Sequence, residues 1–304
     1  MVGAQGPAGS RRRLGAELRR LRTRCGLNLD QVAAGAHCST SKISRLETGK
    51  GSPKLLDVQR LMTIYGVTSD IESDMLLRLV RDSRGHGWWE PYVDGVAPQP
   101  FVLDSASRYT ALEADAMSIH SFDVIALHGL LQTAGYARAV IEAFFPQHSP
   151  KEITQLVALR LKRQEALLDR DPPLRYTAVI DESMLCRQVG GPQVMTEQLQ
   201  AMQVAARLPN VSLQVLPFTV GMHRAHIGHF AIMKFDDGLG ADMVYVEGSA
   251  GDQYLESESD VALYEDVLAD VTGRALSPVA TLDLVGEYLN APSGRLTLDR
   301  VQDQ

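Results

Sequence analysis

The segment of residues 29–49 carries a pattern that few folds can accommodate. It predicts a short helix from Asp30 to Ala36, and then a second short helix for which Ser39 is a good N-cap. Ala33 is small enough to let the two helices cross steeply, whereas a larger side chain would push them apart. Four residues later, His37 stands in the turn, where the backbone φ is positive and glycine is usual. We therefore expect two packed helices with a strained histidine between them.

Apolar spacing predicts three more helices around this pair. One precedes it and has leucines four and three residues apart, and two follow it, opened by Pro53 and by Ser69. Together the five helices form an all-α unit over residues 11–83. The side chains expected to be buried in it are Leu14, Leu18, Leu21, Val32, Ile43, Leu46, Leu56, Leu61, Tyr65, Ile71, Met75, Leu76 and Leu79.

The charge of the chain is divided unevenly. Residues 1–60 hold 12 Lys and Arg against 4 Asp and Glu, a net charge of +8, whereas the whole chain carries −7. Residues 61–304 therefore carry −15. A basic module on an acidic body is typical of a nucleic-acid reader with a separate second domain. The alternative is that the basic side chains only solvate helix surfaces.

The helix pair has the pattern of a helix-turn-helix, and it resembles the Xre/Cro-like family of transcriptional regulators. Residues 43–50, followed by Pro53, are the most family-specific part. The sequence departs from the family at His37 and at Leu29, where many members carry a glutamine that helps to hold a phosphate. The resemblance implies a lambda-repressor-like fold. A five-helix bundle that binds proteins is the alternative.

The resemblance also implies how the motif contacts DNA. In this family the second helix of the motif lies in the major groove, with its N-terminal residues at the base edges. An arginine there can bind guanine O6 and N7 together. By motif position, the base-reading residues are Thr40, Ser41 and Arg45, and the phosphate contacts are Gln31, Ser39, Lys42, Ser44 and Lys50. The acidic Glu47 is expected to form a salt bridge or a cap instead.

The remainder of the chain mixes strands and helices, so the whole is predicted to be α+β. We expect flexible tails over residues 1–10 and 293–304, a linker or strap over 84–100, and a mixed α/β domain for sensing and dimerisation over 101–292. Within that domain a helix is predicted at 109–120. Strands are predicted at 122–127, 174–180, 211–216, 229–235 and 243–246.

The chain as a whole resembles an actinobacterial group in which an Xre-type domain precedes a C-terminal domain of unknown function. The segments that carry this resemblance are 41–49, 87–89, 130–138, 160–164, 180–182, 189–192, 209–218 and 244–247. The resemblance implies regulation of development and secondary metabolism. It also implies an antitoxin-like role, with a small partner protein encoded by an adjacent gene.

Three histidines, His223, His226 and His229, have the one spacing that could hold a metal ion such as zinc. In an extended strand, however, a spacing of three places neighbouring side chains on opposite faces. We therefore expect ordinary loop histidines, with a metal site as the alternative, and no cofactor is predicted. We find no pattern typical of nucleophilic catalysis, so the protein is not expected to be an enzyme.

Four other residues are candidates for contact with a ligand or partner. Asp181 and Glu247 follow predicted strands, where carboxylates often line ligand clefts, although they could equally cap helices or form ion pairs. Trp88 and Trp89 belong to an aromatic strap that could line an apolar pocket or simply cover the core.

These patterns together predict a sequence-specific DNA-binding regulator that forms a homodimer on a double-stranded operator. Its second domain would receive a small-molecule ligand or a small protein. No apolar run is long enough for a membrane helix, no apolar segment near residue 1 indicates a secretion signal, and three cysteines cannot form a disulfide framework. We therefore expect a cytoplasmic, nucleoid-associated protein that does not bind membranes.

Overall fold

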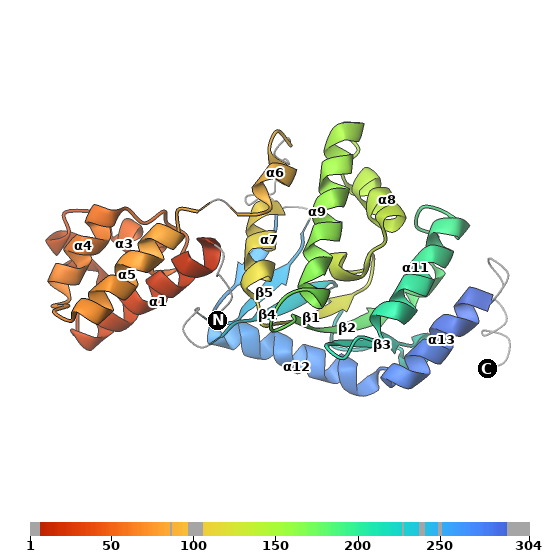
Figure 1. Cartoon of the computed structure of the whole chain (residues 1–304). Coiled ribbons are helices and arrows are strands. Elements are labelled where there is room, and N and C mark those ends of the chain that lie inside the picture. The colour runs from red at the N-terminus through yellow and green to blue at the C-terminus, as the bar shows by residue number, and fades with distance from the viewer. Residues whose placement is uncertain are drawn as a thin grey trace. The chain divides into compact units, whose positions relative to one another are not determined.

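The computed structural model describes residues 7–85, 87–96, 106–226, 228–236, 241–248 and 251–290 (Figure 1). The chain forms two compact units. The first comprises residues 1–90, 107–116 and 235–241, and the second comprises residues 91–106, 117–234 and 242–304. The predicted tail at 293–304 lies outside the described residues. Together the two units make an α+β protein, as predicted.

The first unit contains the five predicted helices. Three of them have a serine or asparagine N-cap whose side chain accepts a hydrogen bond from the backbone of the first turn, which satisfies an otherwise unpaired N–H group. The helices are α1 (Pro7–Arg24), α2 (Leu29–Gly35), α3 (Thr40–Glu47), α4 (Leu55–Ile64) and α5 (Asp70–Asp82).

Helix α1 corrects the predicted tail at residues 1–10, because it already begins at Pro7. Proline is favoured in the first turn of a helix, since its missing N–H group would have no partner there. Ala8, Gly9 and Ser10 follow and are buried. The small residues that resemble a flexible tail in the sequence are therefore suited to close packing. Residues 1–6 lie outside the described part.

The core of the first unit is made by one face of each helix. Most of the predicted core residues are buried, but Leu56 is 70% exposed and Ile71 is 84% exposed, so these two predictions were wrong. In α4, Val58 is buried instead of Leu56, together with the predicted Leu61 and, directly after the helix, Tyr65. Leu56 is two residues from Val58 and therefore lies on the opposite side of the helix.

The turn between α2 and α3 has the predicted geometry. His37 has a φ of 52°, and it is the one residue other than glycine with a positive φ in the described part of the chain. Ala33 is 4% exposed where the two helices meet. The left-handed conformation strains any residue that has a Cβ atom.

Replacing His37 by glycine is expected to raise the free energy of unfolding of the first unit by about 1 kcal/mol, because glycine adopts this conformation without strain. The measurement is urea unfolding of the full chain followed by its helical signal. Ala34→Gly, three residues earlier in α2, should lower the same quantity by about 1 kcal/mol. If His37→Gly lowered the free energy of unfolding as much as Ala34→Gly does, His37 would not be strained.

The segment around the two tryptophans is partly helical. The strap predicted at residues 84–100 contains the short helix α6 (Glu90–Val93), while residues 86 and 97–100 lie outside the described part. The rings of Trp88 and Trp89 meet edge to face, with 5.7 Å between their centroids. Trp89 is buried and Trp88 is partly exposed.

The second unit is built on one six-stranded sheet with the order β3-β2-β1-β4-β5-β6. Strands β1, β2 and β3 are parallel, whereas β4 is antiparallel to both β1 and β5, and β6 is antiparallel to β5. The strands are β1 (Ser118–Asp123), β2 (Arg175–Asp181), β3 (Val211–Leu216), β4 (Phe230–Lys234), β5 (Met243–Val246) and β6 (Gln253–Leu255).

The central strand β1 corrects two predictions. The helix predicted at 109–120 ends earlier, as α7 (Ala106–Asp115), and the strand predicted at 122–127 begins at Ser118 and ends at Asp123. Hydrogen bonds to β2 on one side and β4 on the other explain this shift, because such pairing overrides local helical preference. Strand β6 was not predicted.

Helices cover both faces of the sheet. In Figure 1, α8, α9 and α11 lie on one side and α12 on the other. The face towards α12 is apolar and joins Phe122, Phe230 and Val244 to Val267 and Val271 of that helix. The helical elements that follow β1 in the chain are η1 (Gly129–Leu131), α8 (Ala134–Phe144), α9 (Pro150–Leu168), α10 (Ser183–Cys186), α11 (Pro192–Ala205), η2 (Phe218–Val220), α12 (Glu258–Arg274) and α13 (Pro278–Asn290).

Candidate nucleic-acid interface

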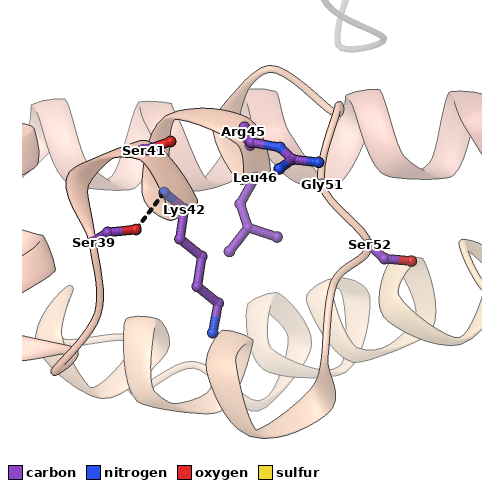
Figure 2. A pocket seen from close by; sticks show the side chains of 7 residues that line it. All are labelled: Ser39, Ser41, Lys42, Arg45, Leu46, Gly51 and Ser52. Atoms are coloured by element: carbon purple, nitrogen blue, oxygen red, sulfur yellow. Dashed lines mark hydrogen bonds between the residues drawn. The ribbon is translucent and has the colours of Figure 1, made fainter. Parts of the chain in front are cut away.

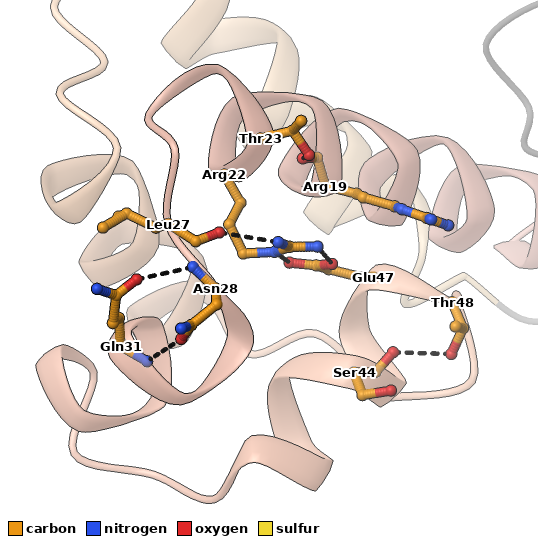
Figure 3. A network of polar contacts seen from close by, with 9 residues as sticks. All are labelled: Arg19, Arg22, Thr23, Leu27, Asn28, Gln31, Ser44, Glu47 and Thr48. Atoms are coloured by element: carbon orange, nitrogen blue, oxygen red, sulfur yellow. Dashed lines mark hydrogen bonds and ion pairs between the residues drawn. The ribbon is translucent and has the colours of Figure 1, made fainter.

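Helix α3 is held in place by a buried ion pair (Figure 3). Both carboxylate oxygens of Glu47 accept hydrogen bonds from the Arg22 guanidinium, at 2.7 Å from Nε and 2.9 Å from Nη2. Arg22 also donates to the Leu27 carbonyl at 2.9 Å, which ties the end of α1 to the start of α2. The side chain of Glu47 is only 4% exposed. The prediction that Glu47 forms a structural salt bridge is confirmed.

Helix α1 approaches α3 closely at Gly15. A Cβ atom on Gly15 would lie 2.6 Å from the backbone oxygens of Leu46 and Glu47. Real contacts of this kind are not found, so only glycine permits this distance between the two helices. Glycine in the middle of a helix costs about 1 kcal/mol relative to alanine. The close packing of α1 on α3 that Gly15 permits fixes the position of α3 in return.

An open hollow of about 210 Å³ lies between α3 and the loop that follows it (Figure 2). Five polar side chains line this hollow, and the chain turns back over it at Gly51, whose N–H group donates to the Arg45 carbonyl at 2.7 Å. The residues that line it are Ser39, Ser41, Lys42, Arg45, Leu46, Gly51 and Ser52. Most of them were predicted to contact DNA.

Of the three predicted base readers, Arg45 and Ser41 are exposed on α3. In the described part of the chain, Arg45 forms no ion pair, so its guanidinium can meet a base. Thr40 is placed differently, because its hydroxyl donates to Asp30 of α2 at 2.7 Å. This bond fixes the angle between α2 and α3. The Thr40 oxygen can still accept a hydrogen bond from a base.

The predicted phosphate contacts lie at the starts of helices, within α3 or directly after it. Ser39 and Gln31 belong to helix starts: the Ser39 hydroxyl accepts from Lys42 N at 3.2 Å, and Gln31 forms a reciprocal capping box with Asn28. The Lys42 ammonium lies 2.7 Å from Asp57 of α4. Ser44 is partly exposed and Lys50 exposed at the end of α3.

Sequence reasoning missed the residues that support the contact residues. Asn28 and Gln31 are three residues apart, which is the spacing of a capping box, so their pairing could have been read from the sequence. By contrast, nothing in the sequence distinguishes Asp30 and Asp57 from ordinary surface carboxylates. Only the approach of α2 and α4 to α3 makes them partners of Thr40 and Lys42.

The three histidines of the second unit have separate partners. His229 pairs with Asp123 at 2.8 Å, His226 lies 3.0 Å from the Arg224 carbonyl, and the ring of His223 stacks edge to face on Phe122. Among the described residues, no group of three or more His, Cys, Asp and Glu side chains could hold a metal ion. The rings of the three histidines thus face different neighbours and do not converge on one point.

The other candidate ligand residues are divided between the two units. Asp181 accepts a hydrogen bond from the backbone N–H group of Ser183, the first residue of α10, at 2.9 Å. Glu247 is exposed after β5. Both belong to the second unit, whereas Trp88 and Trp89 belong to the first.

Comparison with known protein families identifies two separate regions of the chain. Residues 13–74 match the family model described as a helix-turn-helix domain, and residues 106–287 match the model described as a domain of unknown function (DUF5753). No curated protein and no solved structure matches the chain. Within the described residues, no helix has both the length and the apolar character required to cross a membrane.

Proposed function

The chain belongs to the family described as a domain of unknown function (DUF5753), and we propose that it is a sequence-specific DNA-binding transcriptional regulator of the Xre/Cro-like type. The helix-turn-helix domain indicates DNA binding. The observation that carries the proposal further is the hollow beside α3. There the exposed Arg45, which has no ion pair with any residue that the structure describes, lies among other polar side chains.

The proposed complex places α3 in the major groove. Arg45 then donates two hydrogen bonds to guanine, while Ser41 and the Thr40 oxygen meet neighbouring bases. The backbone N–H groups at the start of α3, together with Lys42 and Lys50, meet the phosphates on either side. The basic surplus of residues 1–60 supplies the attraction that does not depend on sequence.

A single helix of eight residues reads few bases, so the regulator is proposed to act as a homodimer. Two copies of α3 would be spaced by about 34 Å on a roughly palindromic site. In this proposal the second unit dimerises and receives the signal, and it has no catalytic role.

The experiment that tests this function is footprinting of the purified full-length protein on the DNA upstream of its own gene, at several salt concentrations. We expect two protected regions about one helical turn apart that persist at moderate salt. Light scattering of the same sample, with and without DNA, measures the oligomeric state.

Two results would contradict the proposal in different ways. Protection that disappears on modest addition of salt would show binding without sequence specificity. A single protected region together with a monomeric mass would support DNA recognition but contradict the proposed homodimer.

A further inference from the structure

A side-chain hydrogen bond joins the first turns of helices α2 and α3. The Thr40 hydroxyl donates to Oδ1 of Asp30 at 2.7 Å. Thr40 is the first residue of α3, and Asp30 is the second residue of α2. The bond therefore lies at the end of α3 that the proposed complex places against the base edges.

The chemistry of the two groups fixes the direction of this bond. A threonine hydroxyl has one hydrogen to donate and two lone pairs that accept, whereas an ionised carboxylate only accepts. The single hydroxyl hydrogen of Thr40 therefore points to Asp30. What the Thr40 oxygen offers to a further partner is a lone pair.

Both ends of the bond are held by capped helix starts. Asn28 and Gln31 form the reciprocal capping box of α2, and Asp30 lies between them in the chain. Ser39, directly before Thr40, caps α3. Because capping orders the first turn of each helix, Asp30 is in place to accept from Thr40 before DNA binds.

Contact with DNA does not reverse this arrangement. A hydrogen bond to a charged acceptor is about twice as strong as one to a neutral oxygen. A carbonyl oxygen on a base edge is neutral, so it competes poorly with Asp30 for the Thr40 hydrogen. Asp30 is exposed, and its negative charge also repels such an oxygen. The pair accordingly favours a base that donates.

The major-groove edge of DNA separates donors from acceptors. Adenine N6 and cytosine N4 carry amine hydrogens there, whereas thymine O4 and guanine O6 only accept. Every base pair thus presents one amine and one carbonyl oxygen, on opposite strands. A side chain that only accepts distinguishes adenine from thymine, and cytosine from guanine, at the position that it faces.

We propose that Asp30 makes Thr40 an acceptor-only reader of DNA, so that Thr40 contacts the exocyclic amine of an adenine or a cytosine in the operator. Asp30 is then a positioning residue, which determines specificity without touching a base. The inference rests on the proposed function, because it concerns the same helix in the same groove.

The first step of the test is selection of bound sequences from randomised duplex DNA by the full-length protein and by its Thr40→Val variant. Valine keeps the branched shape of threonine but lacks the hydroxyl, so one base pair of the selected site should lose its preference, by about tenfold. Unchanged preferences at the other positions show that the variant is folded. Thr40→Ser, which retains the hydroxyl, should keep the preference.

Base analogues at this base pair then identify the group that Thr40 contacts. Purine in place of adenine, or 2-pyrimidinone in place of cytosine, removes the amine. The carbonyl oxygen is removed by 5-methyl-2-pyrimidinone in place of thymine, or by 2-aminopurine in place of guanine. Loss of the amine should weaken binding by the wild type about tenfold more than binding by Thr40→Val. Loss of the carbonyl oxygen should weaken both proteins alike.

Asp30→Ala tests the positioning role. It frees the Thr40 hydroxyl to donate, so sensitivity to the amine should decline and sensitivity to the carbonyl oxygen should appear. Asp57→Ala is the matched control, because Asp57 is a second carboxylate that contacts α3, at 2.7 Å from the Lys42 ammonium. Both substitutions remove one negative charge and should raise the affinity for all DNA, but Asp57→Ala should leave the base preferences unchanged.

The outcomes separate this inference from the proposed function. A pool in which no sequence is enriched would contradict both. An enriched site that Thr40→Val does not alter, or that depends on Thr40 through the carbonyl oxygen, would overturn the inference and leave sequence-specific recognition standing. A loss of preference at all positions in Asp30→Ala would indicate a changed helix angle and would also overturn it. So would an equal change of preference in Asp30→Ala and Asp57→Ala, because charge would then set the preference.

Discussion

Replacing Glu47 by alanine is expected to lower the free energy of unfolding of the first unit by about 3 kcal/mol. The substitution removes both acceptors of the Arg22 guanidinium, which is only 15% exposed. Removing one partner of a buried pair leaves a charge that water cannot reach, and this typically costs about 3–5 kcal/mol. The lower end applies because Arg22 retains its bond to the Leu27 carbonyl.

Urea unfolding of the full chain measures this effect, and the chain offers a matched control. Glu17 pairs with Arg20 at a similar distance, 2.8 Å, but the Arg20 side chain is 50% exposed. Exposed pairs contribute at most about 1 kcal/mol, so Glu17→Ala should change little. Replacing both members of the buried pair, as in Arg22→Met with Glu47→Leu, should recover most of the loss.

An equal effect of Glu47→Ala and Glu17→Ala would show that burial does not strengthen the Arg22–Glu47 pair. The loss should also extend to DNA affinity, because the pair fixes α3 against α1 and α2. DNA binding by Glu47→Ala should therefore decline at a lower temperature than that of the wild type.

Replacing Arg45 by alanine is expected to reduce the preference for the operator over unrelated DNA by roughly 10–100-fold, or about 1–3 kcal/mol. In the proposed complex Arg45 is the residue best able to distinguish guanine, since serine and threonine accept several bases. The side chain is exposed and outside the core, so the fold should be unaffected.

Lys42→Ala is the control for this measurement. It should weaken binding to all sequences by a similar factor and reduce the salt slope by about 1, because a phosphate contact carries no sequence information. The partner of Lys42, Asp57, would then stand unpaired near the DNA, and its repulsion is equally independent of sequence.

Titrations of the operator and of scrambled DNA at two salt concentrations distinguish the two residues. If Arg45→Ala retains the wild-type ratio of affinities, the assignment of base-reading positions on α3 is wrong. If Lys42→Ala changes that ratio, Lys42 reads bases and the motif is shifted along the helix.

Much of the first unit could be predicted from the sequence, because its signals are local. A helix start requires a capping side chain, as at Ser39, and the steep crossing requires a small residue, as at Ala33. Even the strained turn at His37 was predictable, since the motif demands a positive φ at that position. Strands β3 and β5 were predicted with their observed bounds for the same reason.

The predictions were wrong where contacts with distant segments decide whether a residue is buried or which strand it pairs with. Leu56 and Ile71 fit a helical apolar stripe, but the first unit is small enough that other residues of α4 and α5 fill its core. Residues 118–120 resemble the end of a helix, yet two neighbouring strands pair with them. The three regularly spaced histidines, by contrast, were expected to be ordinary loop residues, and each has a different neighbour.

Local spacing thus determined the helix-turn-helix, the α+β class and the position of Arg45 on α3. Tertiary structure alone decided which charges meet: Arg22 with Glu47, Lys42 with Asp57, and Asp123 with His229. The physical reason is distance along the chain. Propensity and capping act within a few residues, whereas the partner of a buried charge is chosen when distant elements pack and exclude water.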